Sequence, residues 1–166
     1  MVNNLKQEII PPDSDVFIDS NIFTYHLLGH KRYRDSVKDF LIKIESGIYT
    51  GYINEVVVSE VYHNFIRVII CDKFNIQPVD FIRFIKPNPE AIAEVDLSKV
   101  TAILSMKNLQ LIHGIKIDMV EENMKMYNLL SSDAIHLSSC KLQNIEYMAT
   151  NDSDFERVDF LNLWMP

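Results

Sequence analysis

The sequence predicts an α/β protein of three layers, an α/β/α sandwich whose central, mainly parallel sheet carries helices on both faces. Short apolar runs of strand length, at 16–18 and 146–150, alternate with segments whose apolar residues recur at helical spacing. Such alternation favours parallel strands, because each helix carries the chain back to the same end of the sheet. A length of 166 residues with 48% hydrophobic residues predicts a single domain, 1–166, with a substantial core.

The first half of the chain is predicted to alternate between strand and helix. Its predicted elements are a loose arm over 1–14, a strand over 16–18, a helix over 22–29, a helix over 33–46, a strand over 49–53 and a helix over 55–70. The arm contains two adjacent prolines, which block a helix. Ser20 or Asn21 is expected to cap the first helix, and Asn54 the third.

The second half begins with residues 72–95, a proline-rich stretch that is predicted to be an insertion with one short helix at 79–86. The predicted elements after it are a helix over 96–108, a strand or extended connection over 109–114, a helix over 117–130, a helix over 133–144, a strand over 146–150, a tight turn over 151–158 and an edge strand over 161–166. Ser131 or Ser132 is expected to cap the helix 133–144, which puts Asp133 in its first turn.

Composition narrows the class of protein. No apolar run approaches the ~20 residues of a membrane helix, and the first residues lack the basic and apolar layout of a secretory signal. Cys71 and Cys140 form no CxxC pair, so neither structural zinc nor a disulfide framework is expected. A cytoplasmic protein is therefore predicted. The net charge of −7 counts against a nucleic-acid binder, although acidic residues that hold a metal would account for part of it.

Acidic side chains stand where predicted buried strands end. Asp19 directly follows the strand at 16–18, and Asp152 comes just after the strand at 146–150. Sites in open α/β sheets form beyond the carboxyl ends of the strands, where helix N-termini also gather. Glu60 lies among apolar residues inside a helix, where a partly buried carboxylate needs a cation or hydrogen bonds. Carboxylates without His or Cys ligands suit Mg²⁺ or Mn²⁺, and one or two such ions support phosphodiester hydrolysis.

Four segments together resemble the PIN-domain nucleases, particularly the VapC-type toxins of prokaryotic toxin–antitoxin modules. They are VFIDSNIF (16–23), VVVSEVYHNF (56–65), SSDAIHLSSC (131–140) and ATNDSDFERV (149–158). The family pattern is an Asp at the end of the first strand followed by a small residue and Asn, a Glu inside a mid-chain helix, an Asp that opens a late helix, and a Thr-x-Asp-x-Asp-Phe turn. Each motif is weak by itself, but the ordered set spans nearly the whole chain.

The resemblance implies a PIN-like fold and a metal-dependent endoribonuclease. The residues that it implies as catalytic groups and as ligands of Mg²⁺ or Mn²⁺ are Asp19, Glu60, Asp133 and Asp152. It further implies that Asn21 and Thr150 support the site by hydrogen bonding and that Asp154 is a ligand through water. The partners that it implies are an RNA substrate, a second copy of the chain in a homodimer, and a small antitoxin protein.

Simpler interpretations stay open for several residues. Asp19 can be a helix cap, Glu60 a solvated helix residue, Asp133 an acid at a helix start, and Asp154 a turn residue. His136, one turn after Asp133, is more often a satisfied helix histidine than a metal ligand or general base.

The densest basic patch consists of Lys31, Arg32 and Arg34, which can contact an RNA backbone or be plain solvated surface. A catalytically silent PIN-like module that binds RNA or a partner is the main functional alternative. A phosphatase of the haloacid-dehalogenase type would need an acid where Asn21 stands, and a receiver domain would need a late strand-end lysine.

Overall fold

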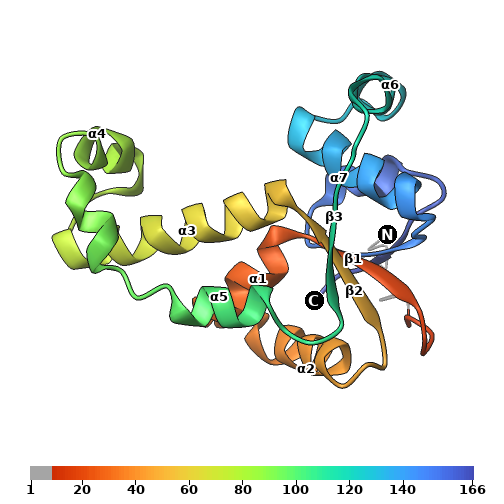
Figure 1. The fold of residues 1–166 in the computed structure, drawn as a ribbon, viewed down its shortest axis with the longest axis horizontal. Coiled ribbons are helices and arrows are strands. Elements are labelled where there is room, and N and C mark those ends of the chain that lie inside the picture. The colour runs from red at the N-terminus through yellow and green to blue at the C-terminus, as the bar shows by residue number, and fades with distance from the viewer. Residues whose placement is uncertain (1–8) are drawn as a thin grey trace, which may run out of the picture.

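A computed structural model describes residues 9–166, which build one sheet with helices on both faces (Figure 1). The strands are β1 (Asp15–Ile18), β2 (Thr50–Asn54), β3 (Leu109–Ile112), β4 (Tyr147–Ala149) and β5 (Asn162–Trp164). Their order across the sheet is β3-β2-β1-β4-β5, and every neighbouring pair is parallel. The predicted α/β/α sandwich is confirmed, and its sheet is wholly parallel. The segments at 109–112 and 162–164 form its two edges.

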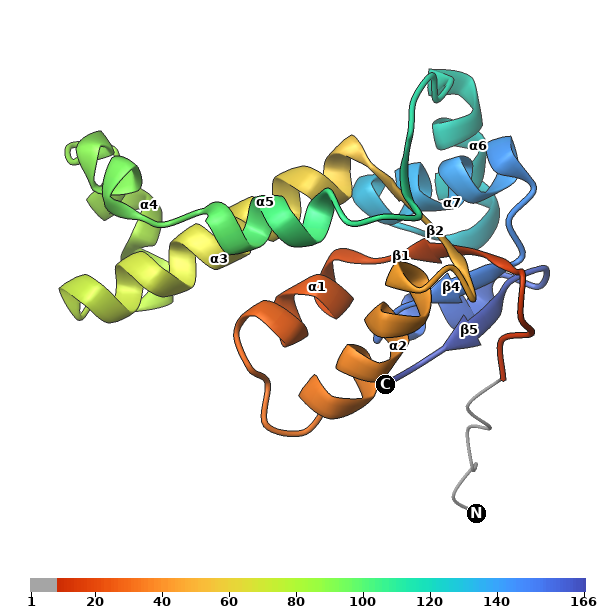
Figure 2. The same ribbon diagram turned by 60° about the horizontal axis from the view of Figure 1, so that its bottom comes forward.

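The helices form two layers. α1 (Ser20–Leu27) and α2 (Arg34–Glu45) lie on one side of the sheet, whereas α6 (Ile117–Tyr127) and α7 (Ser131–Gln143) lie on the other (Figures 1 and 2). α3 (Glu55–Phe74) starts at the sheet and leads away from it, and α5 (Ser98–Leu104) lies alongside it on the way back. The far end of α3 carries η1 (Pro78–Asp80), α4 (Phe81–Ile85) and η2 (Pro89–Glu94), which enclose a small apolar cluster of their own.

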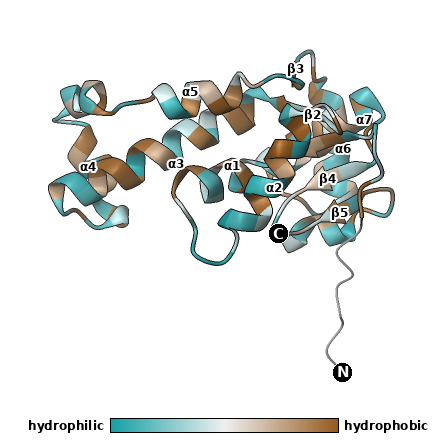
Figure 3. Ribbon diagram, turned by 90° about the horizontal axis from the view of Figure 1, so that it is seen from below, coloured by the Kyte–Doolittle hydropathy of each residue, from teal (hydrophilic) through white to brown (hydrophobic). Residues whose placement is uncertain are grey.

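The central strand β1 explains why the predicted strands are continuous apolar runs. Val16, Phe17 and Ile18 are fully buried, as expected for a parallel sheet that is covered on both faces. In the neighbouring β2, a Cβ at Gly51 would come within 2.9 Å of the terminal methyl groups of Ile18 and Leu109, so a larger residue there would displace these side chains. By contrast, the loop between α1 and α2 is hydrophilic (Figure 3).

The predicted caps of two helices are wrong. α1 and α7 begin directly after Asp19 and Leu130, which hold the cap positions without a side-chain hydrogen bond to the helix. The polar residues at 20–21 and 131–132, which were expected to be caps, therefore lie inside the first turns. Asp133 nevertheless lies in the first turn of α7, as predicted.

The predicted N-terminal arm lies partly outside the described residues, because positions 1–8 are not described. From residue 10 the chain is anchored to the core, which corrects the expectation of a loose arm there. Ile10 is buried, its carbonyl accepts a hydrogen bond from the Tyr49 hydroxyl at 3.1 Å, and the Asp13 N–H donates to the Ile48 carbonyl at 2.8 Å.

Residues 72–95 fold into the end of α3, η1, α4 and η2, and their interpretation as an insertion stays a prediction. The single short helix expected at 79–86 is α4, which is flanked by the two 3-10 turns. None of the helices between residues 9 and 166 combines the length and the apolar character that a membrane span requires.

Candidate metal centre

The candidate site lies beyond the carboxyl ends of β1 and β4, where the strand order reverses. From β1 the sheet grows outward through β2 and β3, and the chain then crosses to β4 and β5 on the other side. The register pairs Ile18 with Ala149, so the next residues, Asp19 and Thr150, lie side by side. The Asp19 N–H donates to the Ala149 carbonyl at 3.0 Å. Crevices at such switch points are the usual ligand sites of open α/β sheets.

Asp19 is held in place by three side chains that donate hydrogen bonds to its carboxylate. The Thr150 hydroxyl and the Asn21 amide donate to Oδ2 at 2.6 and 2.5 Å, and the Ser20 hydroxyl donates to Oδ1 at 3.3 Å. Asp19 is only 7% exposed. Its carboxylate accepts no hydrogen bond from a backbone N–H of α1, so its interpretation as only a helix cap is wrong. Both residues predicted to support the site contact it.

A first group of ligand atoms gathers around Asp19. Asp19, Glu60 and His136 each offer one atom, and these atoms lie within 4.8 Å of one another. Glu60 comes from the second turn of α3, and its Oε2 lies 3.7 Å from Nε2 of the buried His136 on α7. The facing His136 ring, with a smaller contribution from the Ser20 hydroxyl, lowers the pKa of Glu60 despite its partial burial. Glu60 is therefore held as a carboxylate that faces the site.

Asn54 sets the orientation of the His136 ring. Its Oδ1 accepts a hydrogen bond from the Val57 N–H at 3.0 Å and so caps α3, as predicted. Its Nδ2 must then donate, and it does so to Ser139 Oγ at 2.8 Å and to His136 Nδ1 at 3.1 Å. Because Nδ1 accepts, the proton of the neutral ring lies on Nε2, which faces Glu60.

A second group of carboxylates lies beside the first. Asp133, Asp152 and Asp154 each offer one oxygen, and these oxygens lie within 4.8 Å of one another. Asp152 is partly committed to its own turn, because its Oδ1 accepts from the Asp154 N–H at 2.8 Å and caps η3 (Ser153–Arg157). Asp154 forms an ion pair with Arg157. Asp152 and Asp154 therefore both take part in the turn, and both also contribute an oxygen to the second group.

The two groups act on each other through Asp133. Burial raises the pKa of Asp133, the Asp152 carboxylate raises it further, and Asp19 and Asp154 add smaller increases that His136 partly offsets. Carboxylates from both groups thus raise the pKa of Asp133. Four chain segments, the start of α1, the second turn of α3, the start of α7 and the turn after β4, bring their acidic side chains to one place.

Comparison with known proteins agrees with this architecture. A family model described as the PIN domain matches residues 16–161. The chain belongs to the PIN domain family. The carboxylates of this PIN domain lie within the matched range, at the switch point of its sheet.

Similar proteins include the VapC ribonucleases. Ribonuclease VapC2 of Methanocaldococcus jannaschii is 33% identical over 151 residues, which cover 91% of this chain and 93% of that protein. Ribonuclease VapC6 of the same organism is 28% identical over 157 residues, which cover 90% of this chain and 96% of that protein. Among solved structures, VapBC2 from Rickettsia felis bound to a DNA fragment from their promoter has a TM-score of 0.58 at 18% identity and covers 92% of this chain and 98% of that chain.

The carboxylate cluster of this PIN domain gives Asp133 a testable effect on stability. The folded protein holds the Asp133 proton more tightly than the unfolded chain does, so ionised Asp133 lowers stability as the pH rises above its ordinary pKa of 3.8. Asp133→Asn removes this destabilising charge, so in EDTA at pH 7 it is expected to raise the Tm by a few degrees. A shift of about that size is usual for a small change in the free energy of unfolding. Thermal unfolding followed by circular dichroism measures this, and the gain should vanish below pH 3.8.

Asp118→Asn is the matched control, because Asp118 stands exposed in the first turn of α6. Neutralising an ordinary helix-start acid removes a favourable interaction with the helix dipole and lowers stability slightly. If Asp133→Asn lowered the Tm in the same way, Asp133 would be only such an acid.

Sequence reasoning favoured a satisfied helix histidine at His136 and kept a place in the metal site as the lesser alternative. The ring is 2% exposed and its nitrogens face Asn54 and Glu60, so it is a satisfied buried histidine and also part of the first group. Its spacing of one helical turn from Asp133 was the available signal.

The predicted basic patch lies outside the two carboxylate groups, at the loop between α1 and α2 of the PIN domain. Lys31, Arg32 and Arg34 lie exposed in the loop after α1 and at the start of α2, and Arg34 pairs with Asp35. Among the described residues, none of the three forms a hydrogen bond or an ion pair with the carboxylates of the two groups. Their predicted contact with RNA stays a prediction.

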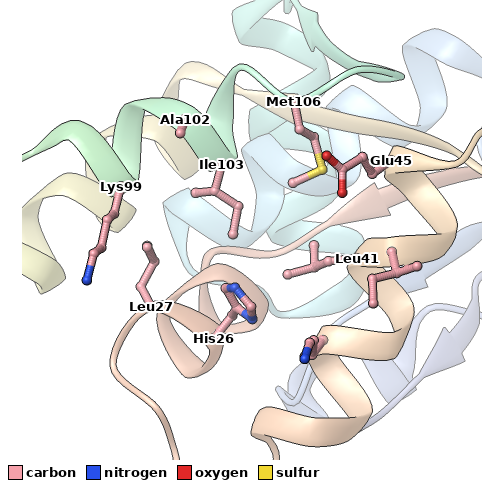
Figure 4. Close-up of a pocket in the computed structure, with 10 residues that line it drawn as sticks. His26, Leu27, Leu41, Glu45, Lys99, Ala102, Ile103 and Met106 are labelled. Carbon is pink, nitrogen blue, oxygen red and sulfur yellow. The ribbon is translucent and has the colours of Figure 1, made fainter.

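A hollow away from the carboxylates is a separate feature of the PIN domain. A cavity of about 590 Å³ lies between α1, α2 and α5, where Figure 4 shows Leu27, Leu41 and Ile103 around it. Glu45 is the single acidic residue among its described lining residues, so the cavity offers no set of metal ligands.

Proposed function

We propose that this PIN domain is a Mg²⁺- or Mn²⁺-dependent endoribonuclease that hydrolyses RNA phosphodiester bonds as the toxin of a toxin–antitoxin pair. The observation that supports it is the convergence of Asp19, Glu60, Asp133, Asp152 and Asp154 at one edge of the sheet. Burial and the neighbouring carboxylates raise the pKa of Asp133, and a divalent ion bound among these side chains would compensate their negative charge. The family and the ribonuclease relatives provide the reaction class.

The donor set fits these ions. Mg²⁺ and Mn²⁺ prefer oxygen ligands, and every acidic residue in the two groups offers carboxylate oxygen. His136 turns its protonated Nε2 toward Glu60 Oε2 at 3.7 Å, so in this arrangement it presents a proton rather than a lone pair. Two adjacent groups can hold one ion or two.

The chain's own residues prepare the site. A bound divalent ion would supply an acidified water and a clamp on phosphate oxygens. Thr150 and Asn21 hold the Asp19 carboxylate in one orientation, and His136 keeps Glu60 ionised and directed at the site. Arg157 holds Asp154 through an ion pair and donates to the Asn128 carbonyl at 2.6 Å, which ties the turn after β4 to the end of α6.

The partners and the compartment are part of the proposal. An antitoxin partner is supported by the fold that the chain shares with VapBC2 of Rickettsia felis. A homodimer is supported by apolar side chains that stand exposed on η1 and α4, such as Val79 and Ile82. Cys71 and Cys140 are buried and free, as expected in a reducing cytoplasm.

Cleavage of a labelled single-stranded RNA with Mg²⁺, with Mn²⁺ and with EDTA tests the function. Cleavage is expected with either ion, is expected to stop in EDTA, and is expected to return when Mg²⁺ is added in excess. Internal cuts, read from the fragment lengths, would identify an endonuclease. Cleavage that continued in EDTA would contradict a metal-dependent reaction. RNA and metal binding without any cleavage would instead identify the catalytically silent binding module.

A further inference from the structure

A compact group of rings lies at the junction of α1 and α2, outside the carboxylate site. We call Tyr25, His30, Tyr33 and Arg32 the ring cluster. The His30 and Tyr33 rings stack with centroids 4.8 Å apart and planes 13° apart, and the Tyr25 ring lies 4.7 Å from His30 and 5.0 Å from Tyr33. The Arg32 guanidinium carbon lies 5.1 Å from the Tyr33 centroid. Three rings and a planar cation therefore form one continuous unit.

The ring cluster is tied directly to the carboxylate site. Asn151 follows Thr150 and precedes Asp152, and its backbone N–H donates to Asn21 Oδ1 at 3.2 Å. Its side-chain Nδ2 donates to the Tyr25 hydroxyl at 3.0 Å. Tyr25 also lies on α1, the helix that starts directly after Asp19. Tyr25 and Asp19 are therefore separated by roughly 9 Å along the helix axis. That distance suits a neighbouring nucleotide on a chain whose phosphate lies at the carboxylates.

Burial divides the ring cluster into an inner part and an outer surface. Tyr25 and Tyr33 are half-buried and pack against the hydrophobic core, whereas His30 and Arg32 are exposed. Core packing accounts for the two tyrosines, whose rings anchor the loop between α1 and α2. The two outer residues lie exposed in the loop between α1 and α2, which is hydrophilic (Figure 3), and core packing does not explain them.

The chemistry of the outer surface matches a nucleobase. Bases stack on aromatic rings and on guanidinium planes, and this is the usual way in which proteins bind single-stranded RNA. The adjacent Lys31 and Arg34 add exposed positive charge in a chain whose net charge is −7. Bases in a duplex are already stacked on their neighbours, so the surface favours an unpaired one.

We propose that the ring cluster is a stacking subsite that holds an unpaired base of the RNA beside the bond to be cleaved. The proposal rests on the proposed ribonuclease function and specifies its substrate as single-stranded at this position. His30 and Arg32 contact the base, and Asn151 and Tyr25 fix the position of the subsite relative to the carboxylates.

Binding of two labelled RNAs to the Asp19→Asn protein in Mg²⁺ tests the subsite without cleavage. One is a short single-stranded RNA of mixed sequence, and the other has the same length and charge but abasic positions. Adding His30→Ala is expected to weaken binding of the intact RNA roughly five- to tenfold, because each stacked base contributes appreciably to affinity. The affinity for the abasic RNA is expected to stay the same. His30→Phe should restore tight binding of the intact RNA.

Matched variants separate stacking from charge. Arg32→Lys keeps the positive charge but removes the planar group, so it should weaken only the intact RNA. Lys31→Ala should weaken both RNAs equally and lower the salt dependence of binding by about one charge. Phe74→Ala removes a ring beside Lys73 at the far end of α3, and it should change neither affinity.

The outcomes distinguish the subsite from the ribonuclease function. If the wild-type protein cleaves RNA while His30→Ala and Arg32→Lys bind both RNAs like their parent, the subsite is wrong and the nuclease stands. If the base-dependent loss is found in a protein that cleaves nothing, the subsite stands and the nuclease is wrong. Failure of the Asp19→Asn protein to bind the intact RNA better than the abasic RNA would overturn the subsite.

Discussion

Replacing Asp19 by Asn is expected to lower Mg²⁺-dependent RNA cleavage by more than about a hundred-fold while the fold is retained. Loss of a group that only supports a metal ligand typically costs 10- to 100-fold, and Asp19 is itself a candidate ligand. The amide has nearly the same shape, so Thr150 can still donate to its oxygen. Initial cleavage rates at saturating Mg²⁺, together with the circular dichroism spectrum and the Tm, measure the two expectations.

Asp15→Asn is the matched control for this experiment. Asp15 starts the same strand, β1, but stands exposed at its opposite end, where its carboxylate faces the Tyr52 hydroxyl. Its replacement is expected to leave the cleavage rate unchanged. A rate close to wild type for Asp19→Asn would mean that the reaction occurs elsewhere on the molecule. Equal losses in both variants would point to a general effect of charge on RNA binding.

The strands and the position of the carboxylates were predictable because both depend on short stretches of sequence. A fully buried parallel strand has apolar side chains on both faces, which is the pattern of residues 16–18. Asp19 and Thr150 follow strands that pair in register, and parallel strands end at the same edge of a sheet. The order of the strands was not predictable, because it depends on which face each connecting helix covers.

The role of His136 could not be predicted, since it depends on how two helices cross. Asn54 lies at the end of β2 and His136 lies on α7, so their contact exists only after α7 packs beside the start of α3. The sequence shows Asn54 as a good helix cap and His136 as an isolated histidine. Neither pattern carries information about the other residue.

The wrong caps have a related cause. Ser, Thr, Asp and Asn are preferred at helix N-termini because their side chains bind the free N–H groups there. At α1 the chain turns into a helix as soon as β1 ends, so Asp19 takes the cap position while its carboxylate is engaged by Thr150, Asn21 and Ser20. Site geometry therefore overrides the local capping preference.

Asn54→Ala is expected to have the largest effect on stability, a loss of roughly 2–4 kcal/mol in the free energy of unfolding. Removing a helix cap costs about 1 kcal/mol, and leaving buried groups without partners costs about 1–3 kcal/mol more. Asn54 is fully buried, and it binds the Val57 N–H, His136 Nδ1 and Ser139 Oγ. Urea unfolding measures the loss. Cleavage below the Tm is expected to fall about 10- to 100-fold, because His136 no longer presents its proton to Glu60 reliably.

Two further variants separate the helix cap from the orientation of the ring. Asn54→Asp keeps an acceptor for the Val57 N–H but removes the donor to His136 Nδ1, so it should retain the cap and still lose activity. Asn123→Ala removes another fully buried asparagine, which binds Ser138 between α6 and α7, and it should lower stability without changing the Mg²⁺ dependence of cleavage. If Asn123→Ala reduced cleavage as much as Asn54→Ala, the effect would follow from lower stability alone. If Asn54→Asp cleaved like the wild type, the Nδ1 contact would have no part in directing Glu60.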